Sequence, residues 1–229
     1  MLLDEHYQFF SRLPLCADLT PPQVTALIND CLRRDFAQGE TIFLQGDPGQ
    51  ALYLIHSGRV RIYVQDEEGQ ESSVILYGPG DVFGELALID GLPRSASAVA
   101  VEATAAYLLT RERFRQQIER TPQLALNLMR ALSVRLRYST EEWSNMAFQD
   151  VPGRLAHKLL ELAEHHSEAT TGGLRITAPL TQSDLASFIG ATRESINKTL
   201  AFFRRQGIVQ IRDGYIIICN AAALREICS

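Results

Sequence analysis

The spacing of hydrophobic residues changes along the chain and separates a β-rich region from a helical one. From residue 36 to residue 109, short runs of β-type residues alternate with turns that contain glycine, as in ETIFLQG, ALYLIHSG, RVRIYVQDEEG and SSVILYGPG. Short strands at nearly regular spacing are typical of an antiparallel β-sandwich or jelly roll. Within this region QDEEGQE, residues 65–71, predicts a hairpin turn between two of the strands.

The period changes at Thr121. Pro122 suits the first position of a helix, and no glycine or further proline follows until after residue 149, which predicts one long helix over residues 121–149. Positions spaced alternately by four and three residues form a seam along it: Ala125, Met129, Leu132, Leu136, Ser139, Trp143 and Met146.

This spacing is the a/d repeat of a two-stranded coiled coil, in which Ser139 is the polar step. It predicts dimerisation through Met129, Leu132, Leu136, Trp143 and Met146. The alternative is a helix that packs on its own domain, which the apolar Leu124 and Leu128 would also fit.

A different composition follows the long helix. DVPGR, residues 150–154, predicts a turn in which Pro152 and Gly153 end the helix. An amphipathic helix follows in RLAHKLLELAEHH, then a loop in ATTGG and a short strand in LRIT. These elements predict a separate C-terminal domain.

Within this domain the sequence has the form of a helix-turn-helix. Thr181 caps the first helix, with Asp184 three residues later, and Gly190 supplies the turn. Thr192 caps the second helix. An Asp-Gly hairpin in IVQIRDGYIIIC closes the motif, as in a winged helix.

The second helix of this motif has two chemically distinct sides. Its apolar side consists of Ile196, Leu200 and Phe203. A plain helical hairpin would account for that side alone. It would not account for the polar residues that crowd the opposite face at the helix start, which are Arg193, Glu194, Asn197 and Lys198.

Charge is unevenly distributed along the chain. The formal net charge is −5 at pH 7, which argues against a protein that coats nucleic acid generally. Residues 1–149 hold 13 Lys and Arg against 19 Asp and Glu, whereas residues 150–229 hold 9 against 8. Any contact with nucleic acid is therefore expected on a local patch of the C-terminal third.

Signals for export, membrane insertion or metal binding are absent from the sequence. No run of about 18 apolar residues exists, and the start MLLDEHYQFF is acidic where a secretory signal is basic, so we expect a cytoplasmic protein. The four cysteines lack CxxC spacing, which favours reduced thiols over disulfides or a zinc site. They are Cys16, Cys31, Cys219 and Cys228.

One apolar stretch, FGELALIDGLPRSASAVA at residues 83–100, contains a few polar residues of specific chemistry. A cyclic nucleotide offers an anionic phosphodiester and a ribose 2′-hydroxyl. Arg94 and Ser95 supply the guanidinium and the hydroxyl that would hold the first. Glu85 supplies an acceptor for the second, and Gly84 allows the backbone to approach closely. The alternative is an ion pair between Glu85 and Arg94 on a solvated loop.

The same stretch resembles a known family. GELALIDGLPRSA is similar to the phosphate-binding cassette of cyclic-nucleotide-binding domains, and the upstream glycines at positions 39, 46, 58 and 80 match the glycine framework of those domains. Together with NMAFQDVPGRLA and GATRESINK, the resemblance covers nearly the whole chain. It identifies the sequence as similar to the Crp/Fnr transcription regulators, in their cyclic-AMP receptor protein branch.

The resemblance implies an α+β fold with three parts. These are a cyclic-nucleotide-binding β-jelly roll over residues 1–120, a central dimerisation helix over 121–149, and a winged helix-turn-helix over 150–229. It also implies a ligand-responsive, sequence-specific DNA-binding regulator rather than an enzyme. Cyclic AMP would be the effector, and the partners would be a second copy of the chain, palindromic DNA with TGTGA-like half-sites, and RNA polymerase, with no membrane.

Site residues follow by matching motifs. The ligand-binding positions are Gly84, Glu85, Leu86, Ala87, Arg94, Ser95, Ser139 and Thr140, the last two in the reverse of the family's Thr-Ser order. The DNA-binding positions are Thr181, Thr192, Arg193, Glu194, Ser195, Asn197, Lys198 and Arg205, with Lys198 in place of an Arg.

Two other functions are alternatives to this one. A Crp/Fnr protein could use cyclic GMP, a cyclic dinucleotide or no effector. A cupin-type metalloenzyme on a similar barrel would need several histidines, and the β-rich region has only His56. We therefore expect no metal and no catalytic residue.

Overall fold

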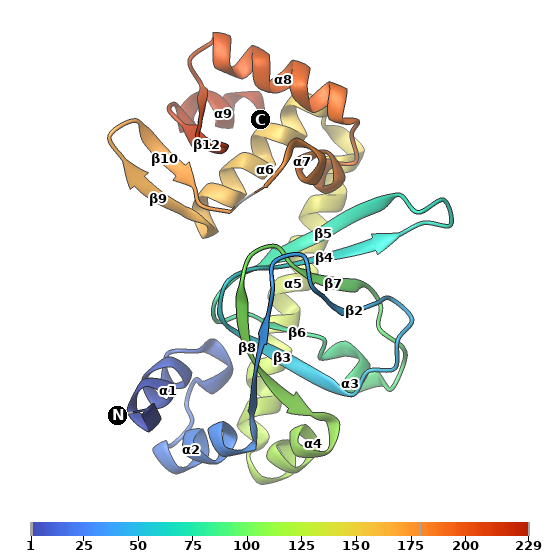
Figure 1. Ribbon diagram of the computed structural model, residues 1–229, viewed down its shortest axis with the longest axis vertical. Helices are drawn as coiled ribbons and strands as arrows, with labels where there is room; N and C mark the ends of the chain where they lie inside the picture. The colour runs from blue at the N-terminus through green and yellow to red at the C-terminus, as the bar shows by residue number, and fades with distance from the viewer. Residues whose placement is uncertain (1, 179, 229) are drawn as a thin grey trace. The chain divides into compact units, whose positions relative to one another are not determined.

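The computed structural model describes residues 2–178 and 180–228 (Figure 1). Its chain divides into two compact units, one made of Met1–Gln65 and Leu76–Ser139 and the other of Asp66–Ile75 and Thr140–Ser229. Mixed helices and antiparallel sheets, with one long helix, α5 (Pro122–Phe148), confirm the expected fold class.

Two four-stranded antiparallel sheets form the β-domain. The first has the order β1 (Leu32–Phe36), β8 (Thr104–Thr110), β3 (Ala51–Ser57) and β6 (Val82–Phe83). The second has the order β2 (Thr41–Phe43), β7 (Ser97–Ala100), β4 (Val60–Gln65) and β5 (Glu71–Tyr77). Aromatic rings join the sheets: Phe43 lies 5.8 Å from Tyr53 and 5.9 Å from Phe83, measured between ring centroids. The core therefore lies between the two sheets, as in a sandwich.

Strand β3 is buried along most of its length because it is covered on both faces. Its residues Ala51 to Ile55 are all buried, which explains why ALYLI is a continuous apolar run without polar alternation. One covering layer comes from the N-terminal helices α1 (Leu2–Ser11) and α2 (Pro21–Asp30) and the 3-10 turn η1 (Pro14–Cys16). Their buried residues Phe10 and Leu27 belong to the same core cluster as Leu52 and Leu54 of β3.

Burial also determines the state of the N-terminal cysteines. Burial raises the pKa of both Cys16 and Cys31 to about 12, so these thiols stay protonated near neutral pH and are poor nucleophiles. All four cysteines are free thiols.

Helix α3 (Leu86–Asp90) lies within the ligand-binding region expected from the sequence, and α4 (Arg111–Arg120) precedes α5. Among the described residues no helix is long and apolar enough to cross a membrane.

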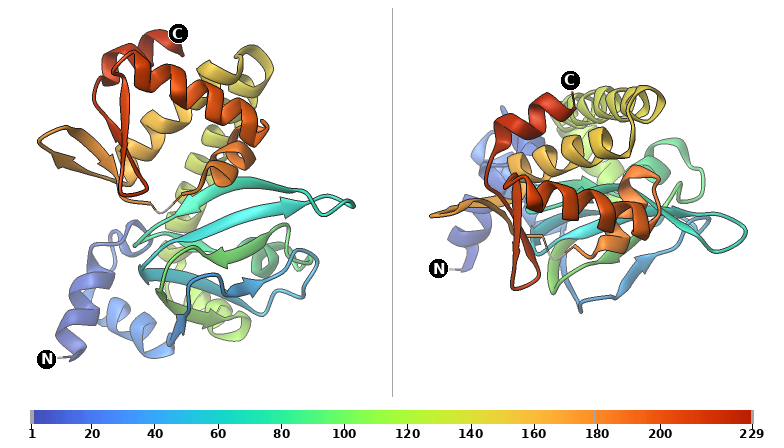
Figure 2. Two further views of the ribbon diagram at one scale, coloured as in Figure 1. Left: turned by 45° about the horizontal axis from the view of Figure 1, so that its top comes forward. Right: turned by 90° about the horizontal axis from the view of Figure 1, so that it is seen from above.

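The second unit is built on three helices that contact one another, α6 (Val151–His165), α7 (Gln182–Ile189) and α8 (Arg193–Arg205) (Figure 2). A four-stranded sheet has the order β11 (Val209–Arg212), β12 (Tyr215–Ile218), β10 (Gly173–Ile176) and β9 (Ser167–Thr170), and α9 (Ala221–Ile227) follows. This unit also includes residues 66–75, where the backbone N–H of Ser73 donates to Oγ of Ser187 on α7 at 2.7 Å.

Two local predictions for the second unit were wrong. Pro152 and Gly153 do not end the long helix, since α5 already ends at Phe148 and both residues lie in the first turn of α6. Asp150 caps α6 by accepting from the N–H of Gly153, and proline is tolerated in a first turn because its missing N–H is not needed there. The expected ATTGG loop is shorter, because β9 continues to Thr170 and β10 begins at Gly173.

Candidate functional site: a nucleotide pocket and a DNA-reading helix

The pocket begins where strand β6 turns into α3. Gly84 has a φ of 76°, and a Cβ at this position would lie 2.7 Å from Nη1 of Arg94. Only glycine fits this turn without displacing the guanidinium. Beyond the helix, Gly91 ends α3 in the left-handed conformation, so the chain returns and Arg94 lies against the start of the same turn.

Arg94 is a buried cation bound by backbone oxygens. Its side chain is 5% exposed, Nη1 donates to the carbonyl of Gly84 at 2.5 Å, and Nη2 donates to the carbonyl of Ala51 at 2.6 Å. The guanidinium carbon lies 4.1 Å from the centre of the Phe43 ring. Burial lowers the pKa of Arg94, but a guanidinium stays charged in proteins. Its buried Nε has no partner among the described residues.

Glu85 is a buried carboxylate with one oxygen in use. It is 2% exposed, and Oε1 accepts from Nη1 of Arg135 at 2.8 Å. Arg135 belongs to α5, also donates to the carbonyl of Val82, and lies over the Tyr77 ring at 4.6 Å. In the described part of the chain, Oε2 of Glu85 has no hydrogen-bond partner. A buried oxygen without a donor costs about 1–3 kcal/mol, so a ligand hydroxyl at this atom would be favoured.

These groups border one cavity of about 80 Å³. Six of the expected ligand positions line it: Gly84, Glu85, Leu86, Ala87, Arg94 and Ser95. Apolar walls come from Phe43, Ile62, Tyr77 and Phe83. A cavity with mostly apolar walls and a few convergent polar groups is typical of a small-molecule site. The alternative of an ion pair between Glu85 and Arg94 is not the arrangement found, because Glu85 pairs with Arg135.

The other two expected ligand positions do not line this cavity. Ser139 and Thr140 lie on α5 and are exposed. Arg135, which sequence reasoning missed, does line the cavity. Its signal was present, since it precedes Ser139 by four residues and so shares its side of the helix.

The long helix exposes the expected seam. Trp143 is 74% exposed, Leu136 70%, Met129 54% and Met146 45%, and Leu132 is half-buried. Large apolar side chains at a/d spacing rarely remain solvated on one helix face, so this face fits a partner helix.

The second unit contains the expected helix-turn-helix. Thr181 and Asp184 form a capping box on α7, and Gly190 ends that helix in the left-handed conformation. Thr192 then caps α8, because its Oγ1 accepts from the N–H of Ser195 at 3.2 Å.

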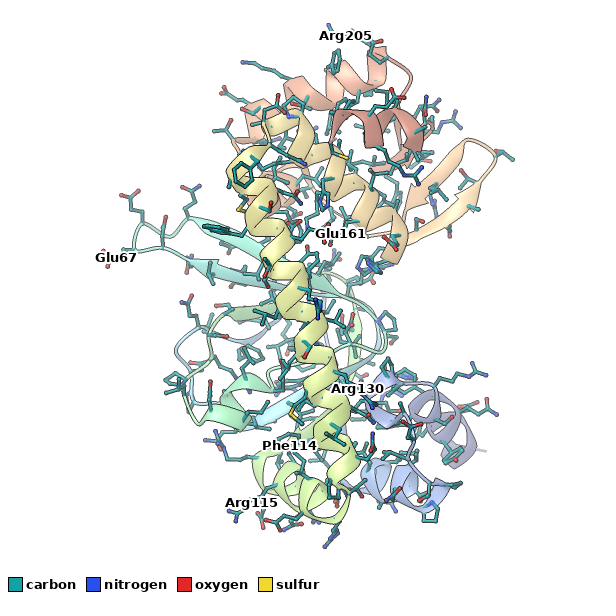
Figure 3. All side chains as sticks on the ribbon, turned by 180° about the vertical axis from the view of Figure 1, so that it is seen from behind. Glu67, Phe114, Arg115, Arg130, Glu161 and Arg205 are labelled. Atoms are coloured by element: carbon teal, nitrogen blue, oxygen red, sulfur yellow. The ribbon has the colours of Figure 1, made fainter. Side chains whose placement is uncertain are left out.

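Helix α8 has the two sides expected from the sequence. Ile196, Leu200 and Phe203 are at most 2% exposed. The side chains on the other side are exposed: Arg193, Glu194, Asn197, Lys198 and, near the C-terminal end of the helix in Figure 3, Arg205. Asp213 and Gly214, both with positive φ, connect β11 and β12 in the expected hairpin. A helix with an exposed polar start, followed by a hairpin, is the element order of winged DNA-binding domains.

Comparison with known protein families gives two matches. Residues 33–121 match the cyclic nucleotide-binding domain, and residues 153–227 match the Crp-like helix-turn-helix domain. A nucleotide-binding domain followed by a DNA-binding motif defines a ligand-responsive transcription regulator.

Similar whole proteins agree. The chain is 35% identical over 217 residues to a CRP-like cAMP-activated global transcriptional regulator of Mycobacterium tuberculosis, which covers 95% of this chain and 97% of the relative. The crystal structure of Thermus thermophilus catabolite activator protein is 38% identical, with a TM-score of 0.55, and covers 94% of this chain and 98% of that one. The chain therefore belongs to the Crp/Fnr family of transcription regulators.

A third similarity concerns the fold alone. The structure of the c-di-GMP-responsive regulator CLP of Xanthomonas campestris superimposes with a TM-score of 0.77 at 22% identity, covering 87% of this chain and 99% of that one.

Family membership makes this protein a DNA-binding regulator with a cyclic-nucleotide-binding domain, not an enzyme, and excludes the cupin alternative.

Proposed function

We propose that this regulator responds to cyclic AMP bound in the cavity between β6, α3 and Arg94. The observation that carries the proposal is a pair of buried polar atoms without partners among the described residues: an acceptor, Oε2 of Glu85, and a donor, Nε of Arg94. A cyclic nucleotide has the complementary pair, a ribose hydroxyl that donates and a phosphodiester that accepts.

The remaining expected residues have roles around these two. Ser95 donates a hydrogen bond from its hydroxyl to the phosphate. Gly84, Leu86 and Ala87 form the wall of the cavity beside Ser95. Ser139 and Thr140 contact the adenine from α5. The relative from M. tuberculosis is named as cAMP-activated, which supports the choice of nucleotide.

Calorimetric titration of the purified protein with cyclic AMP, cyclic GMP and cyclic di-GMP tests the effector. We expect cyclic AMP to bind most tightly. Tighter binding of either other nucleotide would identify that nucleotide as the effector in place of cyclic AMP. Failure of all three to bind would show that none of them is the effector.

Glu85→Ala is expected to weaken cyclic AMP binding more than binding of 2′-deoxy cyclic AMP. The reason is that the deoxy ligand has already lost the hydroxyl that Oε2 would accept. Because the substitution disturbs Arg135 equally for both ligands, the ratio of the two losses isolates the ribose contact. Calorimetry measures both, and Glu119→Ala, at an exposed ion pair on α4, is the control. Equal losses for the two ligands would show that Glu85 does not bind the ribose.

We propose further that the protein acts as a cytoplasmic homodimer. The effector domain would comprise residues 1–120, the dimerisation helix 121–149 and the DNA-binding domain 150–229, with the dimer contacts at Met129, Leu132, Leu136, Trp143 and Met146. Cyclic AMP would shift a population towards the state that presents both α8 helices to successive major grooves, and it must bind that state more tightly to do so.

DNA reading is assigned to the start of α8. Arg193 can pair with guanine O6 and N7, and Glu194 can accept from cytosine N4. Thr181, Thr192, Ser195, Asn197, Lys198 and Arg205 would contact phosphates or bases around them. The proposed target is a palindrome with TGTGA-like half-sites centred roughly 34 Å apart, and RNA polymerase is the proposed further partner.

Glu194→Ala is expected to relax base preference at one symmetric pair of positions in a selection from random DNA. An acid beside phosphates lowers affinity unless it gains a specific donor, so its removal should change sequence preference. Arg205→Ala is the matched comparison. It should lower affinity evenly across sequences and reduce the salt slope by about one unit per site. An unchanged selected sequence in Glu194→Ala would show that Glu194 only caps α8 through the helix dipole.

A further inference from the structure

A compact group of ionisable side chains joins the C-terminal part of α5 to α6. One oxygen or nitrogen from each of Glu142, His157 and Glu161 lies within 4.8 Å of the other two. The three side chains are only 18%, 24% and 19% exposed, respectively. This partial burial distinguishes them from the solvated acidic clusters common on protein surfaces.

The local structure explains why these side chains meet. His157 and Glu161 are four residues apart on α6, and this spacing places both on one face of the helix. Glu142 approaches the same face from α5, where its Oε1 lies 3.4 Å from Nδ1 of His157. Figure 3 shows Glu161 beside α5. A ligand pair at i and i+4 completed by a residue from a second helix is a recurring way to build a metal site.

Nδ1 of the imidazole faces two side chains of α5. Nδ2 of Asn145 lies 3.1 Å from it and Oε1 of Glu142 lies 3.4 Å from it. Nδ1 accepts from Asn145 in one tautomer and donates to Glu142 in the other. A cation bound at Nδ1 would take the place of the Asn145 N–H and lie against the Glu142 carboxylate.

Charge favours a divalent cation. Glu141 lies 3.8 Å from Nε2 of His157 and adds a third carboxylate to the group. Nζ of Lys158 lies 2.6 Å from Glu161 and 3.7 Å from Glu142 and brings one positive charge to these side chains. With His157 neutral, three carboxylates and one ammonium leave two negative charges. A proton on His157 compensates one of them, and a divalent cation compensates both.

We propose that Glu142, His157 and Glu161 form a binding site for a divalent transition-metal cation, with Zn²⁺ as the expected ion. One imidazole and two carboxylates suit Zn²⁺, whereas Mg²⁺ and Ca²⁺ prefer oxygen ligands only. Water would supply the fourth ligand. Because the ligands come from two helices, the bound ion would fasten the end of α5 to α6.

Zinc binding to the full-length protein, stripped with chelator and dialysed, tests this site. Calorimetry with ZnCl₂ should show one site per chain that is at least about tenfold weaker in His157→Ala and in Glu161→Gln. His165→Ala is the matched control, because His165 is an exposed residue at the end of the same helix. Zinc affinity that is absent in the parent protein, or unchanged in both ligand variants, would overturn the proposal. Circular dichroism checks the fold, and Glu161→Gln carries the test should His157→Ala not fold.

Two further measurements separate a metal site from a network of ion pairs. Lys158 competes with the metal for both carboxylates, so Lys158→Gln should tighten zinc binding, and weaker binding in this variant would contradict the competition. A proton and a metal ion compete for the same lone pair of His157, so zinc binding should weaken as the pH is lowered. Affinity independent of pH would exclude His157 as a ligand.

Discussion

Arg94→Ala is expected to weaken cyclic AMP binding at least about tenfold. The substitution removes a charge-assisted contact to the phosphodiester in a buried site, worth roughly 1.5–3 kcal/mol. Calorimetric titration measures the loss. Arg94→Lys should recover part of it, since an ammonium supplies the charge but not the forked geometry of a guanidinium.

Arg94 is also structural, so the experiment needs controls. The side chain satisfies the carbonyls of Gly84 and Ala51 and packs on Phe43, and its loss should lower the melting temperature. Arg115→Ala, at a side chain 83% exposed on α4, should change neither property. Unchanged affinity in a folded Arg94→Ala protein would remove Arg94 from the ligand site.

Trp143→Lys is expected to convert the dimer into monomers or a loosened dimer. In the proposed seam, Trp143 of one chain faces its own copy across the two-fold axis, so the substitution places two like charges together in an apolar interface. Sedimentation should then report a species near the chain mass of 25.6 kDa in place of twice that mass. High salt should partly restore association, because it screens the repulsion.

Ser144→Lys is the matched control for this experiment. Ser144 is the next residue of α5 and is exposed, but it falls outside the a/d positions, so the added charge should leave the dimer intact. A fully dimeric Trp143→Lys protein would show that α5 associates through another face or not at all.

Local chemistry made much of the fold predictable. Thr181 with Asp184, and Gly190 after them, specify helix ends through hydrogen bonds that depend only on neighbouring residues, and the a/d seam depends on helix geometry alone. DVPGR was misinterpreted because proline marks both the end of one helix and the first turn of the next, and the cap at Asp150 decides between the two. The N-terminal helices were not predicted, although Thr20 and Gln23 form a capping box at the start of α2 and Pro21 suits its first position.

The site was predictable to the extent that one segment supplies it. Gly84, Glu85, Arg94 and Ser95 lie within twelve residues, and a motif of that length is visible in one sequence. Arg135 lies fifty residues from the carboxylate that it binds. Such a pairing depends on how the helix packs against the sheet, and the sequence indicates only that Arg135 shares the side of α5 that carries Ser139.

The hydrogen bond between Arg135 and Glu85 makes α5 part of the ligand pocket. The same helix carries the exposed apolar seam. Effector binding at Glu85 that changes the affinity of α5 for a second helix does so by some factor. By thermodynamic reciprocity, association of α5 with that helix changes the affinity for the effector by the same factor. The apparent dissociation constant of the effector would then depend on the concentration of the protein itself, and a cell could tune its sensitivity through the abundance of the regulator.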